Sequence, residues 1–287
     1  MHTSNPTNEV LTTIAGMELA CRRFNAGAPV KVLGLHGWQD SAATFDRLGP
    51  LLPQIELVAL DLPGHGFSQR RTTGVYHFID YAADAIHALD SLGWSRCSLL
   101  GHSMGAGVAA LVAGTIPKRI DRYCAIEGLG AMTQQPRDTP ANLHSAIQDE
   151  IRRRQRSTKR VFATREDAVG ARVRAGPIDP SSAEVLASRG LDAVDGGFRW
   201  RTDPMLRMAS RMRLTEAQIH AFLQQIACPT LVIRAQDGFP VPEEYWQKRL
   251  ALVQNLTLQT LPGRHHLHLD NPEPVAEMVA RFLAAVS

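Results

Sequence analysis

The chain has only four cysteines among its 287 residues, and they are widely scattered. They form no C-x-x-C pair, and no short cluster of histidines and cysteines offers the ligand spacing of a zinc site. The sequence therefore predicts neither a disulfide framework nor a bound metal. Buried free thiols are the expected role of Cys21, Cys97, Cys124 and Cys228.

A long hydrophobic run and a strong net charge are also missing. No stretch of about 18 apolar residues occurs, and residues 1–10 lack the apolar segment of a secretion signal. The formal net charge is only +3, which is small for a protein that grips a polyphosphate backbone. We therefore expect a cytoplasmic protein with no stable membrane insertion and no nucleic-acid partner.

The composition is that of a globular α/β protein. Hydrophobic residues make up 44% and charged residues 21% of the chain, close to ordinary globular averages. Short apolar runs predict strands buried on both faces of a parallel sheet, at 30–35, 55–60, 97–100, 123–126 and 230–233. Helical spacing occurs at 42–52, 78–92, 104–115 and 274–286, and a loosely alternating hairpin at 9–24 turns at 15–17. The alternation of strand and helix predicts a doubly wound, mostly parallel sheet.

Residues 131–225 interrupt this alternation. They have helical composition, and residues 137–225 hold 16 lysines and arginines against 11 acidic residues. We predict a helical cap here, inserted into a core made of residues 1–130 and 226–287. The arginine-rich run at 152–160 could contact a substrate or a membrane, or could form a solvated helix face.

The candidate nucleophile is the serine of Gly101-His102-Ser103-Met104-Gly105, which matches G-x-S-x-G. The motif follows one of the apolar runs and opens a helix-like run, which is the strand-turn-helix setting that it requires. Glycines two positions to either side allow a sharp turn beneath Ser103.

Two backbone amides are the predicted oxyanion donors. The amide of Met104 lies at the positive end of the predicted helix, and the glycine at 37 lets the amide of Trp38 face Ser103. We expect a structural, hydrogen-bonding role for His36, and we place His36, Gly37, His102 and His266 around the substrate site.

A serine hydroxyl needs a base, and histidine is the usual one because its pKa lies near neutral pH. The order nucleophile, acid, histidine places this base late in the chain. The segment 264–270 (RHHLHLD) follows an apolar run at 256–261 and precedes the last predicted helix. We predict His265 as the base, with His266 as the alternative.

These motifs resemble the α/β-hydrolase superfamily, and most closely its serine hydrolase-like branch. The similar segments are VLGLHGWQDSAATFDRLGPLL from Val32, then DLPGHG, GHSMG and HHLHLDNPEP, in the order of that family. The resemblance implies the same oxyanion donors, Trp38 and Met104, and the same base, His265.

The acid of the triad is open between two carboxylates. Members of the superfamily usually carry it in a W-G-x-x-D-type turn, which here reads Arg-Ala-Gln-Asp237-Gly238, so that glycine stands in the family's acid position. Glu127 ends the apolar run at 123–126, a position that some members use instead. A carboxylate there is costly unless it meets a partner such as histidinium, and we favour Glu127 over Asp237.

The expected activity is that of a serine hydrolase on a small-molecule carbonyl substrate, first of all a carboxylic ester. Lactones, thioesters and C–C bonds beside a ketone are alternatives on the same fold. The expected mechanism needs no cofactor and no metal. Two other readings are a catalytically degraded binding protein, supported by the displaced aspartate, and a membrane-associated lipase, suggested by the arginine run.

Overall fold

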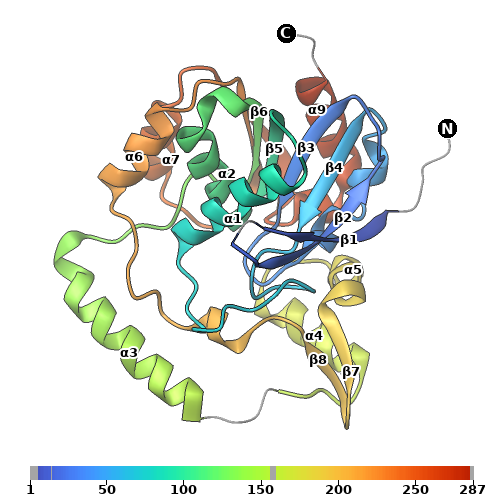
Figure 1. Ribbon diagram of the computed structural model, residues 1–287, viewed down its shortest axis with the longest axis vertical. Coiled ribbons are helices and arrows are strands. Elements are labelled where there is room, and N and C mark those ends of the chain that lie inside the picture. The colour runs from blue at the N-terminus through green and yellow to red at the C-terminus, as the bar shows by residue number, and fades with distance from the viewer. Residues whose placement is uncertain (1–5, 14, 156–159, 285–287) are drawn as a thin grey trace.

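A computed structural model describes residues 6–13, 15–155 and 160–284 of the chain. Its main feature is an eight-stranded sheet with the order β1-β2-β4-β3-β5-β6-β9-β10 (Figure 1). Strand β2 pairs antiparallel with β1 and β4, whereas all pairs from β4 to β10 are parallel. The strands are β1 Thr7–Thr12, β2 Glu18–Phe24, β3 Val30–Leu35, β4 Ile55–Leu60, β5 Cys97–His102, β6 Ile120–Ile126, β9 Thr230–Asp237 and β10 Leu256–Arg264.

The predicted α/β fold with a mostly parallel sheet is confirmed. Strands β3 and β4 have the predicted bounds, and every residue of β4 and β5 is buried, as expected for strands covered on both faces. The predicted hairpin forms between β1 and β2, where Thr12 lies opposite Glu18. All four cysteines are buried and unpaired, also as predicted.

Helices cover both faces of the sheet. Helices α1 (Phe78–Ser91), α2 (Met104–Thr115), α6 (Glu216–Gln224) and α7 (Glu243–Leu250) bury apolar side chains in a core on one face. Helix α9 (Pro272–Leu283) packs on the other face through Val275, Val279 and Leu283. It begins two residues before the predicted position, and the predicted end at 286 lies outside the described residues.

The prediction of a helix at 42–52 is wrong. Two short 3₁₀ helices, Ala42–Phe45 and Gly49–Leu51, stand in its place. Pro50 has no N–H to continue an α-helical ladder, and burial of Phe45 and Leu48 in the second core accounts for the apolar pattern.

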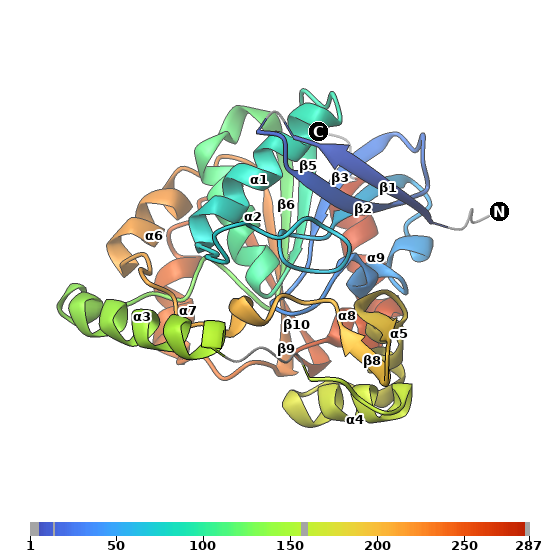
Figure 2. The same cartoon turned by 60° about the horizontal axis from the view of Figure 1, so that its bottom comes forward.

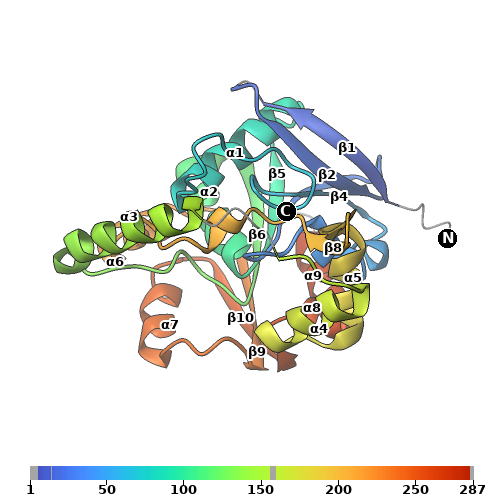
Figure 3. The same cartoon turned by 90° about the horizontal axis from the view of Figure 1, so that it is seen from below.

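The chain between β6 and β9 forms α3 (Thr139–Gln155), α4 (Arg165–Ala175), α5 (Pro180–Gly190), β7 (Leu191–Val194), β8 (Gly197–Trp200) and α6. Figure 1 shows α3, α4, α5 and β8 beyond one end of the main sheet, and Figures 2 and 3 show α3 on one side of the molecule and α4, α5 and β8 on the other. A small core joins α4 and α5 to Ala43 and Leu269. Helix α6 lies within the predicted cap, 131–225, but it packs on α2 of the core through Ile219 and Leu223. The limits of the cap therefore stay a prediction.

Within the segment predicted as a helical cap, the structure also forms an antiparallel strand pair, β7–β8. Gly196 and Gly197 both have positive φ, at 79° and 137°, which glycine adopts at little cost in a tight hairpin. Both strands are half-buried, so the sequence lacked the apolar run that marks a buried strand.

The arginines at the end of α3 are largely paired on their own helix. Arg153 lies 3.0 Å from Asp149 and Arg154 lies 2.9 Å from Glu150. Residues 156–159 of the predicted arginine-rich run lie outside the described part of the chain. Among the helices that the structure describes, none has the length and apolar character needed to cross a bilayer.

A pair of glycine substitutions tests the packing that positions α2. A Cβ on Gly105 would lie 2.1 Å from the carbonyl oxygen of Leu35, whereas a Cβ on Gly170 in α4 would meet only the end of the Arg174 side chain at 3.2 Å. We expect Gly105→Ala to lower the free energy of unfolding by about 1–3 kcal/mol through overpacking. Gly170→Ala should raise it by up to about 1 kcal/mol through helix propensity. Urea denaturation of both variants checks this, and equal effects of the two would contradict it.

Candidate active site

Ser103 occupies a strained turn between β5 and α2. Its backbone angles are φ 51° and ψ −115°, a region that residues with a side chain rarely adopt. Its N–H donates to the carbonyl of Ile126 at the end of β6 over 2.8 Å. Glycine is needed here for the strand and the helix to approach each other, because a Cβ on Gly101 would lie 2.5 Å from the Cα of Ala106. The hydroxyl is thereby presented at the carboxyl end of the sheet.

His265 links this hydroxyl to a carboxylate. Its Nε2 lies 2.9 Å from Ser103 Oγ, and its Nδ1 lies 3.1 Å from Oε2 of Glu127. With the proton on Nδ1 donated to Glu127, Nε2 is free to accept the proton of the serine. Residues 103, 127 and 265 are therefore joined in one hydrogen-bonded chain, in the geometry that activates a nucleophile.

Glu127 is held by the backbone of β9 and the loop after it. The N–H groups of Ala235 and Phe239 donate to its carboxylate over 2.7 and 3.0 Å. Its own N–H donates to Ile233 O over 2.9 Å, and its φ is 55°. A Cβ on Gly238 would lie 2.3 Å from Oε2 of Glu127. Gly238, which stands in the family's usual acid position, therefore leaves the space that the Glu127 carboxylate occupies.

Asp237, the other candidate acid, is exposed at the end of β9. Its backbone pairs with Arg264 in the sheet register, next to His265 in sequence. The contact with the His265 ring is nevertheless made by Glu127.

The two candidate oxyanion residues lie at the start of α2 and in the loop after β3. Met104 is the first residue of α2, and the first N–H groups of a helix have no acceptor within it. Trp38 is half exposed, and its indole N–H donates to Leu206 O of the insertion over 3.3 Å. Gly37 permits the close approach of this loop, because a Cβ there would lie 2.9 Å from Nδ1 of His102.

His36 lies between two loops at the carboxyl end of the sheet. It is fully buried, its Nδ1 donates to Gly37 O over 2.7 Å, and its Nε2 accepts the Leu62 N–H over 2.9 Å. Burial lowers the pKa of His36, so the ring stays neutral and can both donate and accept. It ties the loop after β3 to the loop after β4, which is the structural role expected for it.

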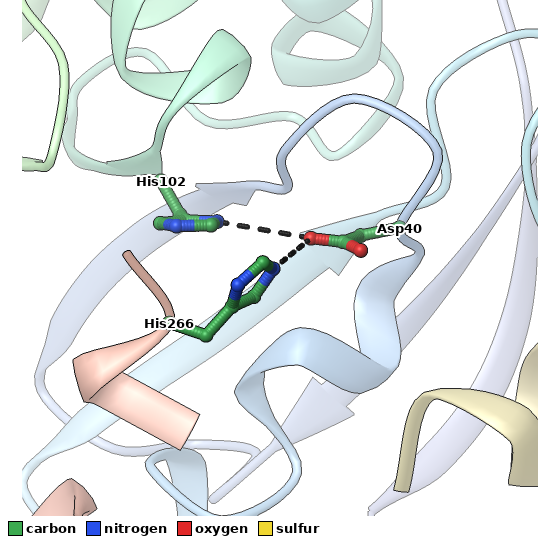
Figure 4. A group of neighbouring side chains, drawn as sticks. All are labelled: Asp40, His102 and His266. Carbon is green, nitrogen blue, oxygen red and sulfur yellow. Dashed lines mark hydrogen bonds and ion pairs between the residues drawn. The ribbon is translucent and has the colours of Figure 1, made fainter. Parts of the chain in front are cut away.

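The rings of His102 and His266 are buried beside the ring of His265, at centroid distances of 4.9 and 5.4 Å from it. His102 donates from Nε2 to the carbonyl of His265 over 2.8 Å. Burial, together with the neighbouring histidines, holds the pKa of His102 well below its usual value. His266, the alternative base, instead places Nε2 3.1 Å from Oδ2 of Asp40 (Figure 4). Both residues support the loop of His265 from the buried interior, and their place around the substrate stays a prediction.

Asp40 is the neighbour that sequence reasoning missed. Burial opposes its ionisation, but the charges of His266 and Arg172 hold its pKa well below the usual range. Arg172 of α4 reaches it over 2.9 Å. Its place four residues after His36 is the one signal that could have drawn attention to it, since the chain turns there at the end of a central strand.

Comparison with known proteins agrees with this architecture. Residues 31–272 match the family model described as alpha/beta hydrolase fold. A serine hydrolase-like protein of Danio rerio is 31% identical over 263 residues, which cover 88% of this chain and 81% of that protein.

Solved structures show the same fold. A hypothetical protein from Pseudomonas aeruginosa PAO1 is 40% identical, with a TM-score of 0.88 over 98% of both chains. The thioesterase domain from the curacin biosynthetic pathway superposes with a TM-score of 0.82 at 22% identity, over 96% of this chain and 99% of that one, a likeness of fold alone. The chain belongs to the α/β-hydrolase family, in its serine hydrolase-like branch.

Proposed function

We propose that this hydrolase cleaves a carboxylic ester through an acyl-enzyme on Ser103. The observation that carries the proposal is the hydrogen-bonded chain from Ser103 Oγ through the His265 ring to Glu127. His265 takes the serine proton as Oγ attacks the carbonyl carbon, and Glu127 stabilises the imidazolium that forms. The same histidine then returns the proton to the leaving alcohol.

The amides of Trp38 and Met104 are the proposed donors to the oxyanion. A donor of this kind contributes about 2.7–4 kcal/mol to the transition state. Water deprotonated by His265 then attacks the acyl carbonyl and releases the acid. Every catalytic group in this scheme is a side chain or backbone amide of the protein.

An ester is the first substrate class to test, because the steps above are sufficient for it. Lactones and thioesters follow the same path with another leaving group, and one fold neighbour is a thioesterase domain. A panel of p-nitrophenyl esters, lactones, acyl thioesters and a vinylogous diketone separates them by kcat/KM. We also propose that the insertion caps the site and excludes water from it.

A fluorophosphonate probe tests the nucleophile. Wild-type protein should react with the probe and hydrolyse short p-nitrophenyl esters. Ser103→Ala should lose labelling and about 10⁶-fold in kcat, because no other residue can form the acyl-enzyme. Ser95→Ala, at an exposed serine, is the matched control and should behave as wild type. A wild type that neither labels nor turns over would instead identify a hydrolase-like binding protein.

Conservative substitutions of the two carboxylates test the acid. Glu127→Gln should lower kcat by about 10³–10⁴-fold, since the amide cannot stabilise the imidazolium and disturbs the tautomer of His265. Asp237→Asn should retain nearly full activity, because Asp237 is exposed. Single-turnover kinetics measures both, and a larger loss for Asp237→Asn would overturn the assignment.

A further inference from the structure

A cluster of histidines lies behind the proposed base. The ring of His102 has its centroid 4.2 Å from that of His268, and 4.9 Å from those of both His265 and His266. The Nδ1 atoms of His102, His266 and His268 are buried and find no hydrogen-bond partner among the described residues. Three such nitrogens in one cluster are unusual, because buried polar atoms are nearly always paired.

Three atoms of the cluster and its neighbour Asp40 converge. Asp40, His102 and His266 each offer one ligand atom, and these three atoms all lie within 4.8 Å of one another. The carboxylate oxygen is 3.1 Å from the His266 nitrogen and 3.8 Å from the His102 nitrogen. Figure 4 shows the two rings facing the same oxygen.

One nitrogen of this group has no hydrogen-bond partner. Nε2 of His102 donates to the carbonyl oxygen of His265, whereas its buried Nδ1 finds no partner among the described residues and lies 3.8 Å from Oδ2 of Asp40. A bound cation would give this buried nitrogen and the neighbouring carboxylate oxygen a common partner.

The surroundings resemble those of metal sites in two respects. A histidine ligand usually donates its second ring N–H to a carbonyl or carboxylate, as His102 does to His265. A Cβ on Gly37 would lie 2.9 Å from Nδ1 of His102 and 3.0 Å from Oδ2 of Asp40. The missing side chain at position 37 therefore leaves the two ligand atoms uncovered.

We propose that Asp40, His102 and His266 bind a divalent transition-metal ion of the zinc type. Two imidazole nitrogens and one carboxylate oxygen suit Zn²⁺ and Co²⁺. Such ligands bond at about 2.0–2.2 Å, so metal binding draws the three side chains closer together. The ligands come from the loop after β3, the end of β5 and the turn before α8 (Leu267–Asp270), which is why no spacing motif marks them.

Arg172 sets the affinity of this site. Its Nη2 lies 2.9 Å from Oδ1 of Asp40 and 3.4 Å from Nε2 of His266. The guanidinium thus occupies the position of a competing cation and repels a metal ion. The ion should therefore bind reversibly, and more tightly once this charge is removed.

Metal binding should also slow hydrolysis, a consequence that rests on the proposed function. His266 follows the base directly, and His102 holds the backbone carbonyl of the base. Closure of both rings on an ion displaces His265 from Ser103, and a displacement of this kind lowers kcat. Zn²⁺ should inhibit ester hydrolysis, and EDTA should restore it.

Titration with Co²⁺ tests the site itself through its visible d–d absorption, with the untagged full chain left to equilibrate because the ligands are buried. We expect one Co²⁺ per wild-type chain, displaced by Zn²⁺, and at least tenfold weaker binding by Asp40→Asn and His266→Gln. His220→Gln is the control, since it removes a histidine paired with Glu216 at 3.2 Å elsewhere on the chain, and it should bind as wild type.

Two further variants keep the outcome unambiguous. Arg172→Gln should bind Co²⁺ about tenfold more tightly, a gain that poor folding cannot produce. Ser103→Ala should bind Co²⁺ normally, so failure of the metal site and failure of the proposed hydrolysis are distinguishable. Equal binding by wild type and Asp40→Asn, or weaker or unchanged binding by Arg172→Gln, would overturn the proposal.

Discussion

The burial of one carboxylate constrains the whole candidate site. Glu127 has its side chain almost entirely out of solvent, and a charge in that position must be solvated by the protein. The backbone amides of Ala235 and Phe239 and the ring of His265 provide this solvation. These partners belong to the next strands of the sheet, since the order β5-β6-β9-β10 places the ends of four strands side by side. The sheet order, set by apolar burial, thereby brings serine, glutamate and histidine together.

This arrangement requires strained backbone conformations in two turns. Ser103 and Glu127 both have positive φ without being glycine, and each such residue costs of order 1–3 kcal/mol. The turns support each other, because the Ser103 N–H donates to the residue before Glu127. A Cβ on Gly128 would lie 2.6 Å from Ser103 O, so only glycine allows the two turns to pack so closely.

The sequence predicted strands well where both of their faces are buried, and poorly where they are only half-buried. Strands β3 and β4 were predicted to the residue because continuous apolar runs mark them. The half-buried β7 and β8 carry no such run, and the apolar pattern before Pro50 indicated a helix that the proline prevents.

In the candidate site, the sharp turn at Ser103 could be predicted from the glycines on either side of it. The choice between Glu127 and Asp237 was not settled by spacing, because the contact of Gly238 with the Glu127 carboxylate joins two strands far apart in the sequence. Asp40 was missed for the same reason.

The uneven charge of the chain has a structural explanation in the way the insertion is held. Residues 137–225 carry 16 basic against 11 acidic side chains, and the rest carry 15 against 17. Arg189 of α5 pairs with Asp61 after β4 over 2.8 Å, with both side chains buried, and Arg172 of α4 pairs with Asp40 after β3. Removing one partner of a buried pair costs about 3–5 kcal/mol, so each pair fastens the insertion to a loop of the core. The loop of Asp40 also carries Trp38, so Arg172 of α4 supports the loop of a proposed oxyanion donor. These two arginines of the basic segment thus attach the insertion to the core.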